Sequence, residues 1–216
     1  MSAGVEDSIK QALASSGLNA LQVERIKQLT EYISLLLRWN ARTNLTSVRD
    51  ADGIIRRHFV ESIACAQALP ERVRTLLDFG SGGGFPGIPI AICRREIAVT
   101  LAESQGKKAA FLQEAVRVLE CSTWSNPIRI HAGRAEMLHV EHFDCVTLRA
   151  VDRMEEAVGA GAARVRGAGG WLALMTTTTD VDELQTKAGP GFLWRENLAL
   201  PGGESRVLAL GERVEP

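Results

Sequence analysis

Residues 75–94 read TLLDFGSGGGFPGIPIAICR, and the rest of the chain is organised around this stretch. It opens with a short apolar run that ends at Asp78 and Phe79. Four glycines follow within five positions: Gly80, Gly82, Gly83 and Gly84. Glycine permits positive φ angles and lets a ligand approach the backbone closely, while Pro86 and Pro89 suit the start of a helix. The pattern predicts a buried strand, a tight turn and a helix whose free N–H groups cradle a nucleotide-type ligand.

Two overlapping glycine spacings in this stretch point to different ligands. Gly82-x-Gly84-x-x-Gly87 fits the dinucleotide motif, so NAD is one alternative. Asp78-x-Gly80-x-Gly82 resembles the first motif of S-adenosylmethionine-dependent methyltransferases with a Rossmann-like fold. An acid at the strand end suits the cationic amino group of that cofactor, directly or through water, and would repel a pyrophosphate. The second spacing is favoured, and a purely structural turn that binds nothing is a third alternative.

The composition is that of a globular protein. The 216 residues suit one domain of about 150 residues with an extension, and 45% are hydrophobic. No apolar run approaches the roughly 20 residues that span a bilayer, and the first ten residues lack the apolar centre of a signal peptide. Four scattered cysteines form no C-x-x-C pair: Cys65, Cys93, Cys121 and Cys145. We therefore expect buried thiols in a reduced, cytoplasmic compartment, with no bound metal.

The apolar periodicity predicts helices through most of residues 1–70. One would run from about 20 to 39 with Asn19 as its cap, and Asp50 or Asp52 would cap a second. Further along, we expect strands near 75–79, 97–102, 128–130, 143–148 and 169–175. Helices are expected at 106–120, 152–166 and 180–187, with a closing hairpin of 192–200 and 205–210.

A second block of the sequence carries a specific resemblance. Its members are Trp39-Asn40, Asn44-Leu45-Thr46, Arg49, Arg57-His58-Phe59 and Ser62. Together with DFGSGGGFPGIP, this block resembles the GidB/RsmG family, methyltransferases that modify N7 of one guanine in bacterial small-subunit (16S) ribosomal RNA. Both motifs occur in the family's order and at suitable spacing. One departure is that Thr176-Thr177 stands where the family usually has Lys-Gly, which puts that edge of the site in doubt.

The resemblance implies an α/β fold, the Rossmann-like methyltransferase fold with a seven-stranded, mostly parallel sheet. Residues 1–70 would form an RNA-facing helical extension, and residues 71–216 the methyltransferase domain. The implied cofactor is S-adenosyl-L-methionine. An acid about 20 residues after the loop can accept both ribose hydroxyls. The expected cofactor-binding residues are Asp78, Gly80, Gly82, Phe85, Glu103, Ser104, Gln105, Ala135, Glu136 and Arg149.

Charge is distributed unevenly, although the formal net charge is only −1. Five arginines lie between residues 38 and 58 against two aspartates, which favours an anionic partner. The expected partner is small-subunit ribosomal RNA or the small ribosomal subunit. We expect the protein to be a monomer and to bind no membrane. The candidate RNA-binding residues are Arg38, Arg42, Asn44, Arg49, Arg56, Arg57, His58, Lys107 and Lys108. For the lysines the alternative is a solvated surface, and for His58 it is a structural role beside Glu61.

The chemistry of guanine N7 requires little from the protein. N7 already carries an in-plane lone pair, so no general base is needed and the task is to align the reactants. The sequence accordingly predicts no certain catalytic residue, with Arg149 as the candidate. No (N/D)-P-P-(Y/F) block of amino-group methylases is present. The alternatives are an NAD-dependent oxidoreductase, a binding module without activity, or a methyltransferase for another RNA or a small molecule.

Overall fold

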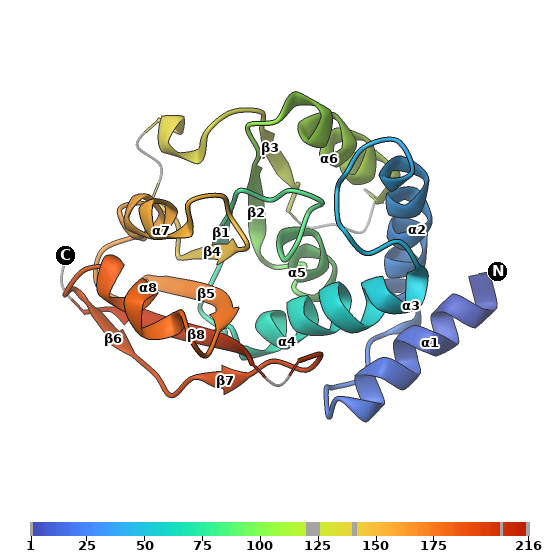
Figure 1. Cartoon of the computed structure of the whole chain (residues 1–216), viewed down its shortest axis with the longest axis horizontal. Coiled ribbons are helices and arrows are strands. Elements are labelled where there is room, and N and C mark those ends of the chain that lie inside the picture. The colour runs from blue at the N-terminus through green and yellow to red at the C-terminus, as the bar shows by residue number, and fades with distance from the viewer. Residues whose placement is uncertain (1, 120–125, 140–141, 204, 215–216) are drawn as a thin grey trace.

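A single mixed β-sheet forms the centre of the molecule (Figure 1). The computed structural model describes residues 2–119, 126–139, 142–203 and 205–214. Within them the sheet follows the path β3-β2-β1-β4-β5-β8-β6, and β7 pairs with β8. The strands are β1 Thr75–Phe79, β2 Ala98–Ala102, β3 Arg129–His131, β4 Cys145–Arg149, β5 Trp171–Thr177, β6 Phe192–Trp194, β7 Leu198–Ala199 and β8 Arg206–Arg213. The helices are α1 Ser2–Ser15, α2 Val23–Asn40, α3 Ala51–Ile54, α4 Val60–Ala68, α5 Gly87–Cys93, α6 Gly106–Leu119, α7 Met154–Ala162 and α8 Val181–Lys187.

The predicted α/β class and mostly parallel sheet are confirmed, but the sheet of the described residues has eight strands rather than the seven predicted. Strands β1 to β5 pair in parallel, and β8 runs antiparallel beside β5. The outer arm of the predicted hairpin is divided between two short strands, β6 and β7, which both pair with β8. Strand β1 lies between β2 and β4, so the chain order reverses beside it. Ligands of open α/β sheets bind at such a reversal, beyond the carboxyl ends of the strands.

Two apolar cores lie on opposite faces of the sheet. One contains Leu36 of α2, Ile63 of α4 and Leu101 of β2, together with the apolar faces of α5 and α6. The other contains Val158 of α7 and Leu184 of α8, packed with residues of β4 and β5. The first core crosses the predicted boundary near residue 70. The N-terminal helices are therefore fixed against the sheet by buried apolar surface rather than joined to it by a free linker.

Asn19 does not cap the helix that the sequence predicts from about residue 20 to 39. Helix α2 begins at Val23, and Gln22 occupies the cap position without a side-chain bond. Asn19 instead exchanges two backbone hydrogen bonds with the side chain of Gln67, at 3.1 and 3.2 Å. Asn19 therefore binds α4 and lies three positions before the cap of α2. The cap at Asp50 is confirmed, since its carboxylate accepts the N–H of Gly53 at 2.7 Å.

A π-helical turn, Ile55–Phe59, joins α3 to α4 and orients the block around His58. Phe59 stacks on Tyr32 of α2 with ring centroids 5.6 Å apart. The hydroxyl of Tyr32 donates to the carbonyl of Gly83 in the glycine loop. The N-terminal helices are thus bonded directly to the loop that the sequence places at the ligand.

Candidate functional site

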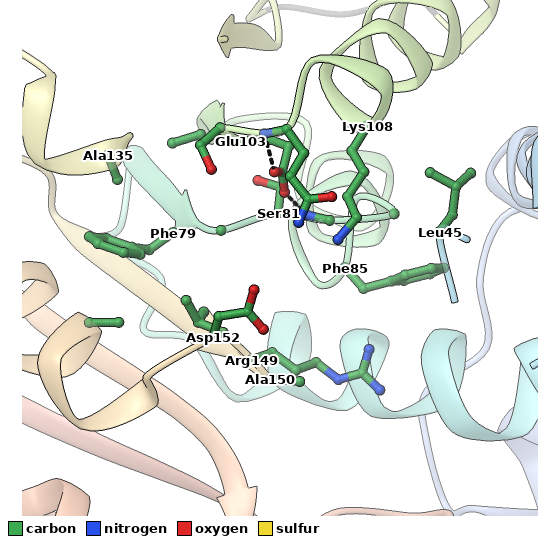
Figure 2. Close-up of a pocket in the computed structure, with 18 of the residues that line it drawn as sticks. Leu45, Phe79, Ser81, Phe85, Glu103, Lys108, Ala135, Arg149, Ala150 and Asp152 are labelled. Atoms are coloured by element: carbon green, nitrogen blue, oxygen red, sulfur yellow. Dashed lines mark hydrogen bonds between the residues drawn. The ribbon is translucent and has the colours of Figure 1, made fainter. Parts of the chain in front are cut away.

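A cavity of about 560 Å³ lies at the carboxyl ends of β1, β2 and β4. It occupies the crevice where the strand order reverses, and Figure 2 shows its walls. All the predicted cofactor-binding residues except Asp78 line it: Gly80, Gly82, Phe85, Glu103, Ser104, Gln105, Ala135, Glu136 and Arg149. The fold brings these residues together from four segments of the chain. Their contacts with a cofactor remain predictions.

The glycine loop forms one wall of the cavity with bare backbone. Gly82 has φ +56°, a left-handed conformation that favours glycine. A Cβ at this position would find only the carbonyl of Gly80 nearby, at 3.9 Å, so the space above the loop is open. The loop is anchored by the N–H of Ser81, which donates to the carbonyl of Ala102 at 2.9 Å. This geometry allows a ligand to lie directly against the main chain.

Glu103, directly after β2, places a carboxylate against this loop (Figure 2). One of its oxygens accepts the N–H of Gly82 at 2.8 Å, and the other accepts the N–H of Gln105 at 2.7 Å. A carboxylate offers about four acceptor positions, so capacity remains for the hydroxyls of a ligand. A carboxylate at this point suits the ribose hydroxyls of an adenosyl ligand and of a dinucleotide alike.

Asp78 lies beneath the loop and does not line the cavity. Its side chain is buried, and its oxygens accept the hydroxyl of Thr147 at 3.0 Å and the N–H of Gly87 at 3.1 Å. Burial raises the pKa of Asp78 to about 6, although these hydrogen bonds act in the opposite direction. That Asp78 binds the cationic amino group of a cofactor remains a prediction. From its position beneath the loop, Asp78 could bind this group only through water or attract it over a longer distance.

We expect Asp78→Asn to flatten the pH dependence of stability. Because the folded-state pKa of Asp78 exceeds its usual value of 3.8, the folded state holds this proton more tightly than the unfolded chain. The stabilisation is complete below about pH 4 and is lost as the pH rises through about 6, amounting to about 3 kcal/mol. An amide does not titrate, and it can keep both contacts if its oxygen accepts the N–H of Gly87 and its NH₂ donates to the hydroxyl oxygen of Thr147. Urea unfolding of the two proteins between pH 4 and 8 measures this, and parallel curves would contradict it.

The two ends of the cavity differ in character (Figure 2). Phe79 and Ala135 line one end, where a flat ring has apolar surface on which to pack. Leu45, Phe85 and Arg149 line the opposite end, beyond Glu103. An elongated ligand centred on Glu103 could therefore pack an apolar ring between Phe79 and Ala135. The opposite end of the ligand would then lie near Arg149.

Arg149 is held by residues of the N-terminal helices. Its Nη2 lies within hydrogen-bonding distance of three acceptors, which share its two hydrogens: the carbonyl of Arg57 at 2.9 Å, Nδ1 of His58 at 2.9 Å and Glu61 at 2.8 Å. Burial lowers the pKa of Arg149, and the charge of Glu61 opposes this shift. Burial and the nearby arginines lower the pKa of His58 to about 3, so its imidazole is neutral at working pH. His58 contacts Thr46 and Arg149 rather than serving as the predicted partner of Glu61.

The predicted RNA-binding residues fall into three groups. Arg57, His58 and Lys108 line the cavity. Arg49 is bonded within its own loop, since its guanidinium donates to the carbonyl of Asn40 and to the side chain of Asn44, both at 2.7 Å. The exposed residues outside the cavity are Arg38, Arg42, Arg56 and Lys107. RNA contact by any of these residues remains a prediction, but the loop bonds give Asn44 and Arg49 a structural role in this state.

Sequence reasoning did not identify several residues of the site. Arg206 of β8 and Thr46 both line the cavity. Arg206 approaches Glu61 at 3.5 Å, across 145 positions of the chain. No local pattern marks an arginine in a terminal strand as part of this site. Thr46 lay inside the quoted sequence block, and its polar character between Leu45 and Val48 was the available signal.

The described cysteines do not take part in the site. Cys65, Cys93 and Cys145 are buried, and burial raises the pKa of the Cys65 and Cys93 thiols to about 12. Cys121 lies outside the described residues. Among the residues that are described, no group of His, Cys, Asp and Glu side chains could hold a metal ion, and no helix is long and apolar enough to traverse a bilayer.

Comparisons with known proteins agree on one family. The family model described as "GidB: rRNA small subunit methyltransferase G" matches residues 25–199. A relative named ribosomal RNA small subunit methyltransferase G, from Roseiflexus castenholzii, is 36% identical and covers 97% of this chain and 92% of the relative. A second of the same name, from Stenotrophomonas maltophilia, is 39% identical and covers 96% and 95%. Among solved structures, an O-methyltransferase from Bacillus cereus in complex with SAH shares the fold, with TM-score 0.60 at 14% identity over 97% of this chain and all of the other.

Proposed function

This chain belongs to the GidB family of rRNA small subunit methyltransferases, and we propose that it methylates N7 of a guanine in small-subunit ribosomal RNA. The methyl donor is S-adenosyl-L-methionine. The observation that carries the proposal is the cavity at the strand reversal, where bare glycine backbone and the Glu103 carboxylate lie side by side. Glu103 would accept the ribose hydroxyls, and Phe79 and Ala135 would pack on the adenine. The NAD alternative is disfavoured because the Asp78 carboxylate lies beneath the glycine loop, where it would repel a pyrophosphate.

The residues at the far end of the cavity would position the acceptor base. The cofactor, when bound, supplies a methyl group on a positively charged sulfur. Guanine N7 needs no deprotonation, so the described residues have no proton to remove. Leu45 and Phe85 offer apolar surface for the base, and Arg149 offers N–H donors for an oxygen beside N7. In this account the protein accelerates transfer by holding the reacting atoms in line.

Residues 1–70 would serve as the RNA-facing extension of the methyltransferase domain, residues 71–216. Arg57 and the loop at Thr46 line the cavity from this extension, beside Lys108 of α6. Such cations contact phosphates and fix the register of the RNA without reading its sequence. We propose that the protein acts as a monomer in the cytoplasm, where its ribosomal substrate resides.

Mapping the methylated nucleotide tests this proposal. The purified protein, small ribosomal subunits lacking the modification and labelled S-adenosylmethionine should give one N7-methylguanine, located by mass spectrometry of RNA fragments. Calorimetry should show binding of S-adenosylmethionine and none of NAD. Transfer to no RNA, or to a position other than guanine N7, would overturn it.

Arg57 and Arg56 provide a matched pair for the RNA-binding part. Both side chains are exposed, but Arg57 lines the cavity, whereas Arg56 lines a separate hollow beside α1. We expect Arg57→Ala to weaken binding to the small subunit about tenfold at low salt, as the loss of one charge-assisted contact predicts. The slope of log affinity against log salt should fall by about one.

Arg56→Ala is the control, with the same loss of charge one residue away. It should lower the affinity and the salt slope less than Arg57→Ala does, because the side chain of Arg56 lies outside the cavity. Filter binding across a range of salt concentrations measures both quantities. Equal effects of the two variants would contradict a contact specific to the cavity.

A further inference from the structure

We propose that His58 and Glu61 are positioning residues, which hold Arg149 so that one edge of its guanidinium faces the reactants. This inference rests on the proposed function, because it concerns the same cavity. The three residues belong to different parts of the fold. His58 and Glu61 come from the N-terminal helices, and Arg149 ends β4.

The hydrogen bonds of Arg149 are unevenly distributed over its guanidinium. All three of its protein acceptors are reached through Nη2. Nε is buried without a hydrogen-bond partner in the described part of the chain. Nη1 makes no hydrogen bond to any described residue, although the side chain is only 9% exposed and lines the cavity. The protein thus fixes one nitrogen and leaves donors for a ligand.

The tautomer of His58 follows from its two partners. A guanidinium can only donate, so Nδ1 of His58 accepts from Arg149. The ring proton therefore lies on Nε2, which donates to the hydroxyl oxygen of Thr46 at 2.7 Å. That oxygen also accepts the N–H of Val48 at 3.2 Å. The loop at Thr46 fixes the tautomer of His58, and the tautomer in turn provides the acceptor that holds Arg149.

Glu61 holds Arg149 from another side and offsets its charge. Its side chain is 1% exposed, and one carboxylate oxygen lies 2.8 Å from Arg149 and 3.5 Å from Arg206. Methyl transfer moves positive charge from the sulfur to the guanine ring. An uncompensated guanidinium beside that ring would oppose the change. The buried Glu61 carboxylate reduces the repulsion between Arg149 and the positively charged guanine ring. Arg149 can therefore still serve as a hydrogen-bond donor to the reactants.

The acceptor for the free edge of Arg149 is an oxygen of one of the reactants. Guanine presents O6 next to N7, and the methionine part of the cofactor presents a carboxylate. Both accept hydrogen bonds from a guanidinium. The two sources are separable, because loss of a cofactor contact weakens cofactor binding, whereas loss of an O6 contact slows transfer at saturating cofactor.

Two substitutions of His58 separate its two hydrogen bonds. His58→Asn places an amide oxygen near the position of Nδ1 and keeps the acceptor for Arg149. His58→Gln places an amide nitrogen near the position of Nε2 and keeps the donor to Thr46. We expect His58→Asn to retain transfer within about threefold in single-turnover reactions with small ribosomal subunits. His58→Gln should lose about 10- to 100-fold, because misplacement of a positioned group by about 1 Å has effects of this size.

Calorimetric titration with S-adenosylmethionine assigns the acceptor. An unchanged affinity of His58→Gln points to guanine O6, and a matching loss of affinity points to the cofactor carboxylate. The proposal is overturned if His58→Gln retains the rate, or if both variants lose it equally while their melting temperatures match. Should either variant fail to fold, Thr46→Val and Thr46→Ser repeat the comparison. Thr46→Val removes the hydroxyl that accepts the hydrogen bond of His58, and Thr46→Ser keeps it. Thr46→Val must then lose at least about tenfold, and Thr46→Ser must not.

The outcome for the unsubstituted protein separates this inference from the proposed function. If that protein fails to methylate guanine N7, the proposed function fails. If it methylates N7 but the variants do not show the predicted order, only the positioning role of His58 and Glu61 is lost.

Discussion

Gly84→Ala is expected to destabilise the protein by about 2–5 kcal/mol, the sum of a strained backbone and an overpacked core. Gly84 has φ +90°, which side chains with a Cβ rarely adopt. The added carbon would lie 2.6 Å from Cδ1 of Ile88 and 2.6 Å from the hydroxyl of Tyr32. That hydroxyl is bonded to Gly83 within the core and has no free space to enter. Cofactor binding should fall as well, because the loop carries one wall of the cavity.

Gly106→Ala is the matched control for this effect. Gly106 begins α6, and a Cβ there would meet nothing within 4 Å. This change should leave the free energy of unfolding the same or raise it by up to about 1 kcal/mol. Chemical denaturation of the three proteins provides the comparison. Similar effects at the two positions would show that the glycine loop tolerates a side chain and is not a close-fitting cradle.

Glu103→Gln is expected to weaken binding of S-adenosylmethionine by about 10- to 100-fold. A hydrogen bond to a charged group contributes about 1.5–3 kcal/mol, and about 1.4 kcal/mol corresponds to a factor of ten. The carboxylate accepts two backbone N–H groups, from Gly82 and Gln105, and would accept the ribose hydroxyls as well. An amide must turn its NH₂ towards one of these backbone donors. It therefore disturbs the loop and loses an acceptor for the ligand.

Glu156→Gln removes the same charge from the same cavity and serves as the control. Glu156 lies on α7, is exposed and pairs with Arg153 at 2.9 Å, away from the glycine loop. It should change cofactor affinity less than about threefold, as expected for an exposed ion pair. Isothermal titration calorimetry measures both affinities. Equal losses would mean that Glu103 acts through the total charge of the cavity, and the proposed ribose contact would then fail.

The fold and the part of the cavity formed by the glycine loop and Glu103 could be predicted from short stretches of sequence. Strand β1, the glycine loop and α5 follow one another without interruption, so apolar runs, glycines and prolines describe the local backbone directly. Glu103 was predictable because a parallel strand returns to the same edge after a connection of about 20 residues. The cap at Asp50 is likewise local, since it needs only the N–H three residues on.

The part of the cavity around Arg149 depends on tertiary structure. Glu61 meets Arg149 across 88 positions and Arg206 across 145. No local propensity encodes such a meeting, because it depends on how α4, β4 and β8 pack together. The same holds for Asp78, whose sequence position predicted a ligand contact, whereas packing turned its carboxylate towards Thr147 and Gly87.

Local sequence patterns are sufficient to predict the strand-loop-helix unit, the alternation that gives a parallel sheet, and the family. Those features depend on backbone conformations set within a few residues and on motifs read in order. Long-range packing selects which charged side chains face the cavity and which are bonded within the protein. That choice follows from the burial of charges such as Glu61 and Arg149, because a charge removed from water must find a partner wherever the packed chain provides one.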